Sequence, residues 1–298
     1  MAIRFIDGWE GNPVRDPFDV LIQTLNLING LLNNFENRLD EYEKYIRIYL
    51  ERIHLDQSLM VSAACLAIRD LDEWPQNGWA IYYPTPSSFI AKGEQYFKVN
   101  QTLMLKEYAH AVAQSFEAFE TFLRDLLATF FRLNIRFVDK AKIFEFDNHL
   151  KTKDRRPSDT DYWRGFIDRF YPQNTHVLKA IHNIAPEIKR IENTNNRGID
   201  LKEWFSLVTE VRHATIHSKG TIKPYRIQNL KASVNEHLLS TYAPGLKTNS
   251  GYQVEMSKEA THENLTLFAE YSYIIFKHLS KIAGYTCEIN SFVTESTG

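Results

Sequence analysis

Hydrophobic residues near the start of the chain recur at alternating steps of four and three residues. The repeating positions are Leu21, Leu25, Ile28, Leu32, Phe35, Leu39, Tyr42, Ile46, Tyr49 and Ile53. This spacing forms a heptad seam of about five repeats, which predicts one long helix that packs against a partner along its length. Asp16 and Pro17 precede the seam and are the expected N-cap and first residue of that helix.

The partner of this helix is either another part of the same chain or a second chain in an intermolecular coiled coil. Further apolar residues widen the hydrophobic stripe beside the seam: they are Leu27, Leu31, Ile48 and Leu50. A wide stripe favours burial in a bundle.

Helical periodicity returns in several later segments. The expected helices span 57–74, 101–134, 160–171, 175–192, 200–217 and 258–283. Asn100 is the expected cap of the 101–134 helix, and Asp200 followed by Glu203 is a capping-box-like start for the 200–217 helix. Gly220 is the expected left-handed cap at the end of that helix. The basic stretch 132–156 is expected to be a solvated loop.

Two interruptions in this periodicity predict the domain organisation. Segment 78–86 is expected to be a short strand or an extended linker, which places a boundary between a long-helix region at 1–99 and a helical bundle at 100–298. Segment 221–256 contains prolines and glycines between β-tolerant runs, so it is expected to be an insertion of loop with a small β-hairpin. The predicted fold class is all-α.

Composition supports the all-α class and predicts the compartment in which the protein works. Hydrophobic residues make up 44% of the 298 residues, and only 12 Gly and 10 Pro are present, which favours long helices. Two cysteines, no apolar signal segment and no long apolar run predict a cytoplasmic protein without a disulfide or a membrane anchor. The net charge of −2 means that any nucleic-acid surface must be local.

The segment 211–220 carries the candidate chemistry. Arg212 and His217 lie five residues apart near the end of an expected helix, with His213 between them. Arginine is a permanent cation suited to phosphate, and histidine exchanges a proton near neutral pH. Cleavage of RNA without a metal needs these functions: a base for the ribose 2′-OH, an acid for the leaving 5′-oxygen, and a cation for the phosphoryl charge. The second proton transfer would come from the other chain's His217, from His213 or from water.

The flank of this motif is basic. No Asp or Glu occurs from residue 211 to residue 235, whereas five basic residues do: Arg212, Lys219, Lys223, Arg226 and Lys231. We expect Lys219, Lys223 and Arg226 to bind the phosphates of a substrate.

An arginine followed by a polar residue, three others and a histidine, late in a helical domain, resembles the HEPN superfamily. The resemblance covers about residues 100–285, with Arg212 and His217 at the positions of that family's catalytic pair. It implies a helical bundle, a homodimer, no cofactor and no metal, and cleavage of RNA to a 2′,3′-cyclic phosphate and a 5′-OH. His213 departs from the Asn that is common at its position, and Lys219 replaces a Tyr of one toxin subfamily.

Two other implications of the resemblance concern partners. Many HEPN ribonucleases belong to prokaryotic antiviral defence and toxin–antitoxin systems, so RNA and an antitoxin or other regulatory protein are the implied partners. Many members carry an acidic or polar residue on the first helix of the bundle, for which Glu120 is the first candidate, followed by Glu117 and Asp125.

Two alternatives stay open. His213 and His217 have the i, i+4 spacing of two zinc ligands, but no Glu follows His213 and no third ligand is evident. The other alternative is a non-catalytic helical module that binds RNA or another protein and keeps the motif for binding or packing.

Overall fold

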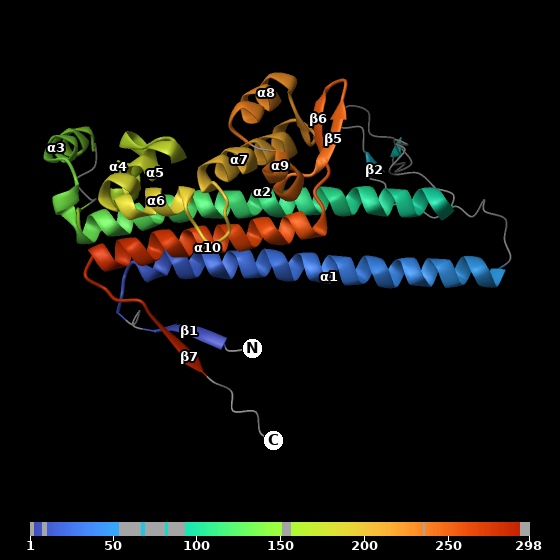
Figure 1. Ribbon diagram of the computed structural model, residues 1–298, viewed down its shortest axis with the longest axis horizontal. Helices are drawn as coiled ribbons and strands as arrows, with labels where there is room; N and C mark the ends of the chain where they lie inside the picture. The colour runs from blue at the N-terminus through green and yellow to red at the C-terminus, as the bar shows by residue number, and fades with distance from the viewer. Residues whose placement is uncertain are drawn as a thin grey trace, which may run out of the picture. The chain divides into compact units, whose positions relative to one another are not determined.

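In the computed structural model, most described residues lie in helices, and the predicted all-α class with a small hairpin is confirmed (Figure 1). The structure describes residues 3–7, 11–53, 67–68, 81–82, 93–150, 156–234 and 236–292. The helices are α1 (Arg15–Ile53), α2 (Gly93–Leu133), η1 (Ile135–Phe137, a 3-10 turn), α3 (Lys140–His149), α4 (Thr160–Phe170), α5 (Asn174–Ile184), α6 (Pro186–Asn193), α7 (Leu201–His217), α8 (Pro224–Ser233), α9 (Glu236–Tyr242) and α10 (Lys258–Ile282).

The strands are short and pair antiparallel. Strand β1 (Ile3–Asp7) pairs with β7 (Glu288–Phe292), and β2 (Ala67–Ile68) pairs with β3 (Ile81–Tyr82). The third sheet has the order β4-β6-β5, formed by β4 (Thr221–Ile222), β6 (Gly251–Val254) and β5 (Gly245–Thr248).

The chain divides into two compact units, residues 1–29 with 109–298 and residues 30–108. This division differs from the boundary predicted at residue 99, because the first turns of α1 pack into the larger unit. Phe18 stacks on Phe276 of α10 with ring centroids 4.7 Å apart. Asn12 donates a hydrogen bond from its side-chain amide to Ser280 Oγ at 3.0 Å.

The core of the larger unit is built from aromatic rings. Phe119 of α2 is fully buried, and its ring lies 5.8 Å from Phe205 of α7, 5.5 Å from Phe268 and 5.4 Å from Tyr271 of α10. Rings of this size contribute much apolar area and prefer such tilted or offset contacts. They fix α2, α7 and α10 against one another, and α7 carries the candidate motif.

The seam of α1 is buried at Leu21, Leu25 and Ile28. The prediction that the apolar residues beside the seam are also buried is wrong for Leu27 and Leu31, because the buried face of α1 follows the seam positions. Leu27 is 63% exposed and Leu31 is 59% exposed. The side chain of Leu50 is not among those that the structure describes.

Several helix ends differ from their predicted positions. Helix α1 begins at Arg15, so Asp16 and Pro17 lie in its first turn, where backbone N–H groups need no helical acceptor. Helix α2 begins at Gly93, so Asn100 is an internal residue and not a cap. The predicted 175–192 helix is broken into α5 and α6 because Pro186 starts a new helix.

Two segments have a different secondary structure from the one predicted. Residues 67–68 of the predicted 57–74 helix form strand β2, and the rest of that segment lies outside the described residues. The stretch 132–156, predicted to be a loop, contains helix α3, whose N-cap Asp139 accepts a hydrogen bond from the Ala141 N–H at 2.9 Å. The short strand predicted within 78–86 is present as β3.

The 221–256 insertion contains the predicted hairpin, formed by β5 and β6, but it also contains the unpredicted helices α8 and α9. Pro224 lies in the first turn of α8, where proline favours helix initiation. Ile227, Leu230 and Val234 give it a buried face at helical spacing. None of the helices in the described part of the chain is both long and apolar enough to cross a membrane.

Candidate functional site

Helix α7 begins with the predicted cap. The Asp200 side chain accepts hydrogen bonds from the backbone N–H groups of Lys202 and Glu203, each at 2.9 Å. Trp204, Val208 and Val211 are fully buried and form the inward face of the helix. Because these side chains fix the rotation of α7, the partly exposed residues of its last turns face away from the core.

The helix ends in the left-handed turn that the sequence predicted. The N–H groups of Ser218 and Gly220 both donate to the Ala214 carbonyl, at 2.9 and 2.8 Å. Gly220 has φ +81°, and Lys219 before it also adopts a left-handed φ of +53°. The turn stops the helix directly after His217, which leaves the His217 side chain exposed at the helix end.

Arg212 faces the acidic residues of α2. Its guanidinium donates to Glu117 Oε1 at 3.0 Å, and 29% of the Arg212 side chain remains exposed. Its Nε is buried and has no hydrogen-bond partner in the part of the chain that the structure describes. Glu117 therefore contacts the arginine directly. It was a candidate in the sequence, but one placed behind Glu120.

Glu120 lies one turn further along α2. Burial raises the pKa of its carboxyl, the positive charges of Arg212 and Arg124 oppose this rise, and Glu117 adds to it. The third candidate, Asp125, instead forms a salt bridge with Arg164 at 2.5 Å. The structure thus brings Glu117 and Glu120 to the arginine and pairs Asp125 elsewhere.

His213 and His217 lie beside each other on α7, with ring centroids 5.1 Å apart. Burial lowers the pKa of His213, and the nearby charges of Arg226 and His217 lower it further; Glu210 opposes them, and Arg212 adds a still smaller lowering effect. The lowered pKa favours the neutral form of His213, which can accept a proton. Arg212 and His217 do not hydrogen-bond to each other among the described residues.

The predicted basic flank is only partly free to bind anions. Arg226 donates to both carboxylate oxygens of Glu210, at 3.1 and 2.8 Å. Lys219 and Lys223 are exposed, and within the described ranges neither forms a salt bridge. The side chain of Lys231 is not among those that the structure describes. Glu210 was missed because it immediately precedes the acid-free segment, although it lies three residues before His213 on the same helix.

The zinc alternative gains no further ligand. Among the described residues, no group of three or more His, Cys, Asp and Glu side chains could hold a metal ion.

Comparisons with known proteins give no family. No family model matches the sequence, and neither a curated protein nor a solved structure matches the chain.

Proposed function

We propose that this protein is a metal-independent endoribonuclease that cleaves RNA by attack of a ribose 2′-OH on the adjacent phosphorus. One observation carries the proposal: two histidine rings lie 5.1 Å apart on the same end of α7 that carries Arg212, whose guanidinium is held by Glu117. This arrangement provides two proton-transfer groups and one fixed cation within a few turns of helix.

Each side chain has a distinct role in the proposal. Neutral His213 takes the proton of the 2′-OH as its oxygen bonds to phosphorus. His217, in its protonated form, gives a proton to the 5′-oxygen as the P–O5′ bond breaks. Arg212 stabilises the extra negative charge on the phosphoryl oxygens. Glu117 engages one N–H of Nη2 and the Nε–H is buried, so the donors that remain for phosphate are the other N–H groups of Nη1 and Nη2.

The products of this reaction are a 2′,3′-cyclic phosphate and a 5′-OH. Lys219 and Lys223 would bind flanking phosphates by charge, since both are exposed. The resemblance to HEPN ribonucleases adds a homodimer, a regulatory partner such as an antitoxin, and a place in prokaryotic defence to the proposal.

The test is cleavage of RNA in EDTA by the wild type and by Arg212→Ala, His213→Ala and His217→Ala. We expect each substitution to slow cleavage about 100-fold or more. His262→Ala on α10 is the matched control, because His262 is exposed and outside the site, and it should cleave like the wild type. Equal rates in all variants would refute the assignment, and loss of wild-type cleavage in EDTA would favour a metal site.

The second candidate is a non-catalytic RNA-binding or protein-interaction module. The observation that favours it is the salt bridge between Arg212 and Glu117, since a paired, half-buried arginine also serves as a packing element. For this candidate, RNA binds without being cleaved, and Glu117→Gln lowers the stability of the fold without releasing any activity.

A further inference from the structure

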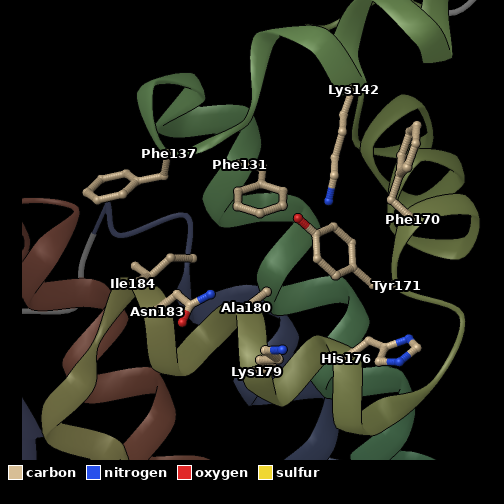
Figure 2. A pocket seen from close by; sticks show the side chains of 10 residues that line it. All are labelled: Phe131, Phe137, Lys142, Phe170, Tyr171, His176, Lys179, Ala180, Asn183 and Ile184. Atoms are coloured by element: carbon tan, nitrogen blue, oxygen red, sulfur yellow. The ribbon is translucent and has the colours of Figure 1, made fainter.

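A cavity of about 430 Å³ lies near the C-terminal end of α2, away from the candidate motif. Figure 2 shows side chains that converge on it from α2, η1, α3, α5 and the end of α4. Its lining includes four aromatic rings: Phe131, Phe137, Phe170 and Tyr171. Phe131 lies at the floor with 1% exposure, and Phe137 at the rim is 39% exposed.

The charged groups at this cavity are positive. They are the ammonium groups of Lys142 and Lys179, with the imidazole of His176 beside them, and no Asp or Glu lines the cavity among the described residues. The Lys142 ammonium lies 4.9 Å from the ring centroid of Tyr171 and 5.6 Å from that of Phe170 (Figure 2). Within the described part of the chain, neither lysine forms a salt bridge, so both ammonium groups are available to an anion.

The walls are held in place by contacts behind the lining residues. Arg124 donates to the backbone carbonyls of Tyr171 and Pro172, at 3.3 and 2.9 Å, which fixes the turn between α4 and α5. Arg169 of α4 bonds Glu145 of α3 at 3.1 Å. A cavity fixed by such bonds exists before a ligand arrives, which lowers the ordering cost of binding.

We propose that this cavity binds a planar aromatic ring that carries a phosphate, the chemical class of the nucleotides. The ring packs against the aromatic side chains, and the phosphate pairs with Lys142 and Lys179. Asn183, which also lines the cavity, offers an amide donor and acceptor to the polar edge of a base. The volume lies within the range of about 300–1,000 Å³ that is usual for small-ligand sites.

This site is distinct from the candidate motif. Phe131 lies fourteen residues beyond Glu117 on α2, which corresponds to about 21 Å along a helix. A free nucleotide offers the required chemistry, and so does an unstacked nucleotide of an RNA strand. Binding experiments separate these two sources without depending on RNA cleavage.

The first experiment titrates the four ribonucleoside monophosphates into the full chain by calorimetry. We expect saturable binding, weakened about tenfold or more by Lys142→Gln and by Lys179→Gln, because each removes a charged partner of the phosphate. Lys140→Gln on α3 and Lys189→Gln on α6 are the matched controls, since both lysines are exposed and do not line the cavity. These controls should bind like the wild type.

The second experiment uses a 2′-O-methylated oligonucleotide, which cannot be cleaved by 2′-OH attack. If monophosphates fail to bind but the two cavity substitutions weaken the oligonucleotide selectively, the occupant is a nucleotide within a strand. If the cavity substitutions weaken neither ligand more than the control substitutions do, the proposal is wrong. It is also wrong if inorganic phosphate binds as tightly as the nucleotides, because the rings would then contribute nothing.

Discussion

In the candidate site, burial and neighbouring charges determine how readily each side chain holds a proton. Burial and the cations around His213 favour its neutral form, whereas the burial of Glu120 favours the protonated form of that carboxyl. Sequence pattern identified Arg212 and His217 as a pair. It did not reveal that Arg226 pairs with Glu210 near His213, because that contact depends on where α8 packs against α7.

The effect of the Arg226 charge on the pKa of His213 can be measured directly. Arg226→Gln removes a charge that lowers the pKa of His213 and leaves Glu210, which raises it, without its partner. We expect the pKa of His213 to rise, as followed by NMR titration of its imidazole. Because a base must be deprotonated to act, the acidic limb of kcat/KM should move to higher pH. Lys223→Gln makes the same charge change without this contact, and an equal shift in it would contradict the explanation.

Glu120 should make folding stability depend on pH. Its raised pKa means that the folded chain holds this proton more tightly than the unfolded chain does. The ionised carboxyl is therefore unfavourable for folding at pH 7, and this cost disappears as the pH falls through the folded pKa toward the unfolded value of about 4.5.

Glu120→Gln removes that cost, so we expect a higher Tm than the wild type at pH 7 and a smaller difference in mildly acidic buffer. Thermal unfolding followed by circular dichroism measures both. Glu107→Gln, at an exposed position of the same helix, should leave the Tm unchanged. A lower Tm for Glu120→Gln at pH 7 would show that its attraction to Arg212 and Arg124 outweighs the effect of burial.

For helices and strands, sequence patterns predicted the features that depend on residues close to one another in the chain. The Asp200 cap, the Gly220 turn and the inward face of α7 follow from residues within a few turns of one another. The break at Pro186 and helix α8 were missed for a different reason. At Pro186 the hydrophobic periodicity continues across the break between α5 and α6, and at Pro224 the periodic stretch is too short to detect. In both places proline starts a new helix.

The Asp200 cap should contribute measurably to stability. Asp200→Ala removes the acceptor for two N–H groups at the start of α7 and should cost about 1 kcal/mol in the free energy of unfolding. Asp159→Ala is the comparison, because Asp159 occupies the N-cap of α4 but makes no side-chain capping bond; its carboxylate accepts instead from the exposed Arg156 N–H and Ser158 Oγ. Urea unfolding compares the two, and equal losses would mean that the capping bonds are not the cause.

A buried polar network joins α5, α6 and α10. Glu192 is 4% exposed and accepts a hydrogen bond from the Tyr271 hydroxyl, and His182 Nε2 lies 2.6 Å from its carboxylate. Tyr271→Phe takes one donor away from this buried carboxylate and should cost roughly 1–3 kcal/mol.

Tyr273→Phe provides the matched comparison on the same helix. The Tyr273 hydroxyl is buried and has no hydrogen-bond partner among the described residues, so its removal should be neutral or stabilising. Unfolding in urea distinguishes the two variants. If both lose the same stability, the network does not stabilise the packing of these helices.

For the chain as a whole, the fold class followed from the pattern, but the grouping of distant segments did not. The first turns of α1 belong to the larger unit because Phe18 packs among rings from α2 and α10, a contact no local pattern encodes. The aromatic cavity was likewise invisible in the sequence, since its lining residues come from several elements between positions 131 and 184.

The paired-histidine mechanism predicts the activity of mixed variants if two chains associate. Both belong to one α7, so a mixture of His213→Ala and His217→Ala chains should remain as inactive as either variant alone. Sedimentation velocity would establish whether the chains associate under the same conditions. Restored cleavage in the mixture would show instead that two protomers contribute complementary histidines to a shared groove.

The most direct measurement compares an all-ribonucleotide strand with its 2′-deoxy counterpart in EDTA, with the product ends identified by mass spectrometry. We predict that the wild type cleaves only the ribonucleotide strand and leaves a 2′,3′-cyclic phosphate and a 5′-OH. Cleavage of the deoxy strand would contradict 2′-OH attack. An unchanged cleavage rate in both His213→Ala and His217→Ala would contradict the paired-histidine mechanism.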